Sequence, residues 1–269
     1  ESGGGMKKVV WALFDSGNGC YKQAVKKYYG DDIKIISIGI DIENKNNDFL
    51  NLDLSDTSEY FGESNLFKEL DKLPKPDIIL ASPPCESWSN ASAMLNGNVC
   101  WYTESTDTMF GQEFVNNEFT IRTRQQLETK NNTPFKKHWW KTVYSRLNGE
   151  LCAFNTIRII ERYQPEVWVI ENPQSSRIWK YYKQIQDFQG IKNIAHYSAY
   201  DSERYSKKPT CFYSNLMFNL KTTDEQSKLT FQGLGDKGIS RSYNVRSEIP
   251  LQLIKDILDQ CFLKLEKIA

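Results

Sequence analysis

Two short apolar runs, each closed by prolines, constrain the fold of this chain more than any other feature. Residues 78–81 precede Ser82-Pro83-Pro84-Cys85, and residues 167–170 precede Glu171-Asn172-Pro173. Apolar runs of this length are typical of strands buried on both faces, and proline ends them because it has no N–H to donate. In open α/β sheets the ligand crevice lies at the carboxyl ends of the strands. The pattern predicts an α/β protein with Cys85 and Glu171 at two strand ends.

Cys85 and Glu171 could act on one small substrate if their strands are neighbours. Adjacent strands lie ~4.8 Å apart, so side chains at both tips can reach a common ligand. A lone cysteine at a strand end is also often a small buried core residue, and that interpretation stays open here.

The two motifs together resemble the C5-cytosine DNA methyltransferases, especially the short forms carried by bacteriophages. The resemblance implies a Rossmann-like fold that binds S-adenosyl-L-methionine (SAM), with a mostly parallel seven-stranded sheet, helices on both faces and a large polar insertion. It implies that Cys85 is the nucleophile and that Glu171 holds N3 of a cytosine flipped out of double-stranded DNA. Amino-methylating enzymes have an aromatic residue where Cys85 stands, which argues against them.

The resemblance also implies sites for SAM and the substrate. Residues 8–14, a glycine turn and a helix over 20–29 predict the first unit of a nucleotide-binding domain. The strand over 33–40 ends at an acid suited to a ribose, for which Glu43 competes with Asp41. The cofactor residues are Phe14, Ser16, Gly17, Asn18, Gly19, Asp41, Ile42, Asp53 and Pro83. The residues expected around the cytosine are Ser82, Pro84, Ser89 and Asn172. Arg204 is a candidate catalytic residue, because the family's Gln-x-Arg-x-Arg pattern is absent.

Charge is distributed unevenly along the chain. The 34 basic and 34 acidic residues cancel, but residues 41–71 hold nine acids and two lysines, and residues 121–146 hold seven basic residues and one glutamate. Basic groups bind phosphates and aromatic rings stack on bases, so the polar segment 90–149 is a candidate DNA-binding insertion. Its expected contacts are Arg122, Arg124, Lys136, Lys137, Trp139 and Trp140. An equally open interpretation is that its aromatic residues anchor the insertion to the core.

The expected organisation is a tag remnant over residues 1–5, a catalytic domain over 6–89 and 150–269, and the insertion over 90–149. Further helices are expected over 64–73, 151–163 and 175–183 and from residue 250 to 268, and further strands over 191–200 and 211–214. The six cysteines are scattered without metal-binding spacing, which favours reduced thiols in a cytoplasm and no metal. No signal peptide precedes Met6, and no apolar run approaches the ~18 residues of a membrane span.

Two alternative functions remain from the sequence. One is a SAM-dependent methyltransferase of RNA, of a modified phage base or of a free nucleotide. The other is a catalytically inactive SAM- or DNA-binding protein of the same fold. A plain NAD-binding domain is a more distant alternative, since it leaves Cys85 and Glu171 unexplained. The sequence does not distinguish a restriction-modification role from protection of phage DNA.

Overall fold

The computed structural model of this protein divides into two compact units. The first comprises Glu1–Pro83, Asn155–Gln174 and Gly190–Ala269, and the second comprises Pro84–Phe154 and Ser175–Gln189. The residues that the structure describes are 7–16, 19–40, 49–108, 111–114, 118–128, 138–225 and 247–267, with the side chains of 91, 105–108 and 111–114 left out.

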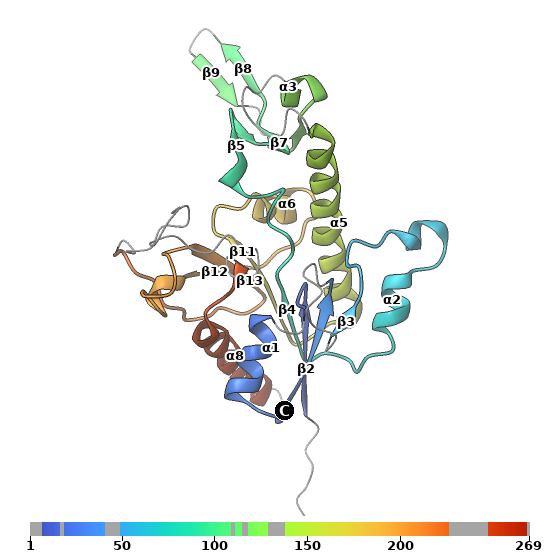
Figure 1. The fold of residues 1–269 in the computed structure, drawn as a ribbon, viewed down its shortest axis with the longest axis vertical. Coiled ribbons are helices and arrows are strands. Elements are labelled where there is room, and N and C mark those ends of the chain that lie inside the picture. Colours follow the sequence, from blue (N-terminus) through green and yellow to red (C-terminus); the bar gives the residue numbers. More distant parts are fainter. Residues whose placement is uncertain are drawn as a thin grey trace, which may run out of the picture. The chain divides into compact units, whose positions relative to one another are not determined.

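A seven-stranded sheet forms the centre of the first unit (Figure 1). Its strands are β1 (Lys8–Leu13), β2 (Ile33–Gly39), β3 (Leu50–Asn51), β4 (Ile78–Ala81), β11 (Val167–Pro173), β12 (Ile191–His196) and β13 (Pro209–Ser214). They lie in the order β12-β13-β11-β4-β1-β2-β3. The five strands from β11 to β3 are parallel, and β13 runs antiparallel to both β11 and β12. The prediction of a mixed α/β fold around a mostly parallel seven-stranded sheet is confirmed.

Helices cover both faces of this sheet, which explains the continuous apolar runs of its central strands. Helix α1 (Cys20–Tyr28) and helix α8 (Leu251–Glu266) lie side by side (Figure 1) and share a core with Val10 of β1 and Leu80 of β4. On the other face, the ring of Trp11 lies 4.6 Å from that of Tyr163, near the end of helix α5.

Helix α2 (Asn65–Leu70) also lies on that other face, beside the last turns of α5 (Figure 1). Ser64 caps α2 by accepting the N–H of Phe67, as expected of a serine at an N-cap. A short helix η1 (Ser58–Phe61) precedes α2, and η3 (Tyr197–Ala199) follows β12.

Several expected element boundaries need correction. Strand β11 does not end at residue 170 but continues through Glu171 and Asn172 to Pro173. Helix α5 spans Trp139–Tyr163, so it begins inside the predicted insertion and not at residue 151. Strand β12 ends at His196, where η3 replaces the last residues of the expected strand. Strand β13 begins at Pro209 and not at residue 211. Proline is tolerated there because it is the first residue of the strand, opposite His196, so its missing N–H interrupts no run of strand hydrogen bonds.

The second unit consists of short elements around a cluster of aromatic rings. Its elements are η2 (Asn90–Ser92), β5 (Ala93–Met94), β6 (Gly97–Asn98), β7 (Trp101–Tyr102), β8 (Ser105–Thr108), β9 (Gly111–Phe114), β10 (Thr120–Ile121), α3 (Arg124–Glu128), the first part of α5, and α6 (Ile178–Gln184). The ring of Trp88 is fully buried, stacks on Trp101 at 5.6 Å and contacts Tyr181 at 4.8 Å. This small core gives the polar segment a fold of its own.

Candidate active site

Strand register brings the ends of β4 and β11 together. The two strands pair in parallel, with Ala81 opposite Ile170. Ser82 and Glu171 are the next residues on each strand, so they leave the parallel pair at the same carboxyl edge. This is the arrangement that the two proline-bounded motifs predict.

An amide bridge fixes the two motifs to each other. The Asn172 side chain is buried, and its Nδ2 donates to the carbonyl oxygen of Pro83 at 2.8 Å. The hydroxyls of Ser82 and Tyr21 share a hydrogen bond of 2.7 Å, which ties the same loop to helix α1. Ser82, Pro83, Glu171 and Asn172 are therefore held as one rigid group within the first unit.

The Glu171 carboxyl group lies in an environment that opposes its ionisation. Burial raises the pKa of Glu171, while the charge of Lys208 and the hydroxyls of Ser82 and Tyr197 oppose this rise. Burial also raises the pKa of Tyr197 and of Tyr21 well above its usual value, so both phenols stay neutral. The net effect is a carboxyl group that takes up a proton more readily than an exposed glutamate does.

Cys85 follows Pro83 by two residues and belongs to the second unit. Its carbonyl oxygen accepts the N–H groups of Trp88 and Ser89, at 3.0 and 2.8 Å, so the loop closes into a tight turn directly after the prolines. The buried amide of Asn98 donates to the carbonyl oxygens of Ser87 and Ser89. The thiol is half-buried, which is compatible with both a reactive and a structural cysteine.

Arg204 pairs with Glu248 in the structure. Its Nη2 lies 2.8 and 2.9 Å from the two carboxylate oxygens, and its side chain is largely exposed. The cation whose charge acts on Glu171 is instead Lys208.

The turn after β1 is built around a buried aspartate. Asp15 Oδ2 accepts the hydroxyl of Ser37 at 2.6 Å. Burial raises the pKa of Asp15, and the Ser37 bond opposes this rise. A Cβ on Gly19 would lie 1.7 Å from Asp15 Oδ1, so any side chain at this helix N-cap would displace the Asp15 carboxylate. Phe14 adopts a φ of 63°, which turns the chain sharply out of the strand.

The expected SAM residues are only partly described. Gly17, Asn18, Asp41 and Ile42 lie outside the described residues. Ser16 follows Asp15 in the turn. Its backbone N–H donates to the Asp15 carboxylate and opposes the rise in the pKa of Asp15.

The carboxyl ends of β2 and β3 offer one apolar and one acidic side chain. Ile40 is 54% exposed just beyond β2. Asp53 lies beyond β3, and its Oδ1 accepts the backbone N–H and the hydroxyl of Ser55. Asp53 is the residue expected at the adenine of SAM, and Asp41, expected at the ribose, lies outside the described residues.

Basic and aromatic residues of the second unit have distinct environments. Arg122 donates to the carbonyl oxygens of Asn98 and Leu95, at 2.6 and 2.7 Å, so it supports the fold of this unit. Arg124 pairs with Glu128 and lies over the ring of Trp139 at 4.8 Å. Lys136 and Lys137 lie outside the described residues.

One face of α5 carries exposed rings. Trp140 is 45% exposed and Tyr144 is 67% exposed, and their centroids lie 6.0 Å apart. Trp139 is half-buried. Trp139 therefore packs within the second unit, whereas the exposed rings of Trp140 and Tyr144 are available to stack on a ligand.

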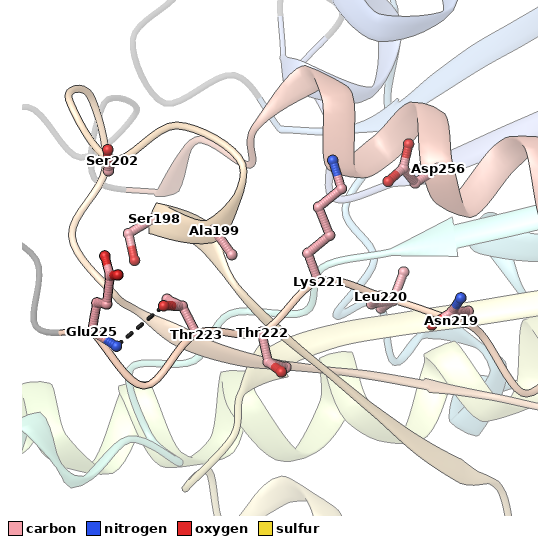
Figure 2. Close-up of a pocket in the computed structure, with 10 residues that line it drawn as sticks. All are labelled: Ser198, Ala199, Ser202, Asn219, Leu220, Lys221, Thr222, Thr223, Glu225 and Asp256. Atoms are coloured by element: carbon pink, nitrogen blue, oxygen red, sulfur yellow. Dashed lines mark hydrogen bonds between the residues drawn. The ribbon is translucent and has the colours of Figure 1, made fainter.

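A polar cavity of about 680 Å³ lies elsewhere in the first unit (Figure 2). Its lining comes from η3, from the segment 219–225 and from Asp256 of α8. Figure 2 shows the Glu225 N–H donating to Thr223 Oγ1, at 3.1 Å. None of its lining residues is among those expected from the sequence.

Comparisons with known proteins give a distant structural likeness. No family model and no curated protein matches the chain. Among solved structures, a methyltransferase from Entamoeba histolytica is similar, with 14% sequence identity and a TM-score of 0.45. The match covers 86% of this chain and 62% of that one, so the chain spans less than two thirds of its length.

Two negative findings concern the described residues. Within the described ranges, no group of histidine, cysteine, aspartate and glutamate side chains is arranged to hold a metal ion. No helix among the same residues combines the length and apolar character that a membrane span requires.

Sequence reasoning missed several residues near Glu171. Tyr21, Tyr197 and Lys208 come from α1, η3 and the approach to β13, and no motif links them. Lys208-Pro209-Thr210 carried a usable signal, because a polar residue before a proline marks a constrained backbone. Asp15 also had a signal, since an acid directly after a buried strand is well placed to brace a turn.

A first prediction concerns the turn after β1. Gly19→Ala should lower the free energy of unfolding by about 1–3 kcal/mol, because the new methyl group displaces Asp15 from Ser37. In an Asp15→Ala background the same substitution should cost much less, because the clashing oxygen is gone. Urea denaturation of the four proteins measures both costs, and equal costs would contradict this account.

A second prediction concerns the ionisation of Glu171. Because its pKa is raised by burial, the folded state loses stability as the pH rises from the ordinary value of 4.5 through the raised pKa. Glu171→Gln should therefore increase the free energy of unfolding at pH 7, and the gain should disappear at pH values below the ordinary pKa.

The measurement for Glu171→Gln is urea denaturation over a pH series. Glu166→Gln, at an exposed position just before β11, is the matched control and should show no such pH dependence. A variant that is less stable than the parent at pH 7 would contradict the prediction.

Proposed function

We propose that this protein is a SAM-dependent methyltransferase that methylates C5 of cytosine in DNA through a covalent adduct with Cys85. The observation that carries the proposal is the bridged pair of strand ends, where Glu171 and Asn172 join the Ser82-Pro83 loop that leads to Cys85. A carboxyl group of raised pKa and a thiol on such neighbouring motifs suit acid–base and nucleophilic work on one ring.

The thiol supplies what C5 of cytosine lacks. C5 is too weak a nucleophile to take a methyl group unaided. A Cys85 thiolate adds to C6, and the electron pair of the C5–C6 double bond becomes available at C5. After methyl transfer a base such as water takes the C5 proton. The electron pair of the C5–H bond then restores the C5–C6 double bond as the C6–S bond breaks and the Cys85 thiolate leaves.

Glu171 stabilises the negative charge that develops on the cytosine ring during this addition. Electron density from the C5–C6 double bond accumulates at N3, which then needs a proton or a hydrogen bond. A carboxyl group with a raised pKa can carry that proton near neutral pH. The hydrogen bond from Asn172 to Pro83 holds the backbone next to Glu171 in place.

Three of the remaining cysteines are poorly suited to the nucleophilic role. Burial raises the pKa of Cys20, Cys100 and Cys211 to about 12 in each case. Thiols of this kind are almost entirely protonated at neutral pH, and the thiolate is the nucleophile. Cys85 is half-buried and follows the strand whose end is bridged to Glu171.

SAM would supply the methyl group from its sulfonium. Residues at the ends of β1, β2 and β3 would hold it. Phe14 and Gly19 flank the tight turn, Ile40 offers an apolar surface, and Asp53 offers a carboxylate. The acidic stretch 41–71 favours a cationic sulfonium over the pyrophosphate of a dinucleotide.

The proposed substrate is DNA, whose target base must leave the helical stack for chemistry at C5 and C6. The exposed rings of Trp140 and Tyr144, with Lys141 beside Trp140, offer stacking surfaces and a positive charge. The Arg122 contacts keep the fold that carries them.

A third prediction tests the nucleophile. Cys85→Ser should abolish transfer of labelled methyl groups from SAM to DNA, because the hydroxyl does not add to C6, while SAM binding should persist. Cys152→Ala, which changes another cysteine of the second unit, should remain active. DNA containing 5-fluorocytosine should form a covalent complex with the parent protein and not with Cys85→Ser. Methylation by Cys85→Ser would rule out the mechanism.

A fourth prediction tests the exposed rings of α5. Trp140→Ala should weaken DNA binding by about 5- to 150-fold, the equivalent of roughly 1–3 kcal/mol for a stacked base, with little loss of stability. Trp139→Ala should instead reduce stability, because Trp139 is half-buried and packs against Arg124. Fluorescence anisotropy and urea denaturation measure the two effects. Unchanged DNA affinity in Trp140→Ala would contradict a stacking role.

A further inference from the structure

Lys208 has a strained backbone beside the site. Its φ is 33°, a left-handed conformation that non-glycine residues rarely adopt. The following residue is Pro209, and proline normally restricts its predecessor to extended conformations. The conformation is therefore disfavoured twice, once by the Cβ of Lys208 and once by the proline ring.

The surrounding hydrogen bonds enforce this conformation. The buried hydroxyl of Thr210 donates to the carbonyl oxygen of Lys208 at 3.0 Å. The N–H of Gln174, just beyond β11, donates to the carbonyl oxygen of Pro209 at 3.0 Å, and that of Tyr197 donates to Lys207 at 2.9 Å. Strained residues held by such a network are concentrated at functional sites.

The side chain of the strained residue lies over Tyr197, one of the groups that interact with Glu171. Lys208 Nζ lies 4.7 Å from the centroid of the Tyr197 ring, a cation–π distance. Tyr197 is fully buried, and its hydroxyl makes no hydrogen bond of normal geometry, although it acts on Glu171. The Lys208 charge is the strongest influence that favours ionisation of Glu171.

Among the residues that the structure describes, the other side chains that interact with Glu171 are neutral at neutral pH. They are Ser82 just after β4, Cys20 and Tyr21 of α1, Tyr197 of η3 and Cys211 of β13. The phenols and thiols among them have raised pKa values and carry no charge at neutral pH. Arg204, the cation expected from the sequence, is paired with Glu248.

We propose that Lys208 is a positioning residue of the active site, held in a strained conformation so that its ammonium group sets the ionisation of the Glu171 carboxyl group. The role rests on the proposed function, in which Glu171 carries the proton for N3. Glu171 must gain that proton before it donates it, and the neighbouring cation opposes the gain. Lys208 thereby sets the pH at which Glu171 becomes a proton donor.

A fifth prediction follows for Lys208→Gly. Glycine accepts a positive φ without strain, so this variant removes the charge while it relieves the backbone. The titration midpoint of Glu171 should move to higher pH, because an opposing charge is lost. The free energy of unfolding should stay equal or increase, whereas loss of a purely structural residue would decrease it.

The measurement is carbon-13 NMR titration of the full chain with labelled glutamate side chains, with the Glu171 signal assigned by its absence in Glu171→Gln. Lys208→Arg should keep the midpoint near that of the parent, because it restores the charge. Lys207→Gln and Arg204→Gln are charge-matched controls and should leave it unchanged. Urea denaturation of each variant gives its stability.

The outcomes separate this inference from the proposed function. A Glu171 midpoint that stays constant in Lys208→Gly, or that moves as far in Arg204→Gln, would overturn the role of Lys208. A shifted midpoint in a protein that does not methylate DNA would support Lys208 as the residue that controls Glu171 and would reject only the cytosine chemistry. The titration needs no substrate, so it tests the effect of Lys208 on Glu171 independently of the proposed methylation of cytosine.

Discussion

The structure of the site depends on the parallel pairing of β4 with β11. Because Ala81 lies opposite Ile170, Ser82 and Glu171 emerge from the parallel pair at one edge, and the Asn172 amide of β11 then binds the loop after β4 through Pro83. A shift of one residue in this register would send Glu171 to the opposite face of the sheet. Everything proposed for Cys85 and Glu171 presupposes this pairing.

Around this pair the protein concentrates groups that resist ionisation. Glu171 and Asp15 are carboxyl groups with raised pKa, and Tyr21, Tyr197 and Cys20 are kept neutral by burial. Buried ionisable groups are costly to a fold, and shifted pKa values cluster at functional sites, which makes this carboxyl edge the candidate site of the first unit. The strained Lys208 adds a charge to the same region, at the point where antiparallel β13 enters beside β11.

The second unit shows how a polar segment without clear periodicity can still fold. Its core is a set of stacked rings around Trp88 and Trp101, and the buried amide of Asn98 holds the loop after Cys85. The unit therefore continues directly from the proposed nucleophile. Arg122 is committed to internal carbonyl groups, and the exposed rings of α5 face outward. Within this segment, Arg122 stabilises the fold, and the exposed Trp140 and Tyr144 are available to a ligand.

The sequence by itself determined the mixed α/β class, the bounds of β4, the start of α1 and the approximate place of α8, because apolar runs, prolines and glycines act locally. It also selected Cys85 and Glu171, since each lies just beyond a buried apolar run in the sequence. Only the tertiary structure decided that β13 lies between β11 and β12, and hence that Lys208 and Tyr197 act on Glu171 while Arg204 pairs with Glu248. Strand order and side-chain partners depend on contacts between segments far apart in the chain, which no local pattern encodes. The early start of α5 at Trp139 was not predicted for the same reason. Its first turns belong to the second unit and depend on contacts made there.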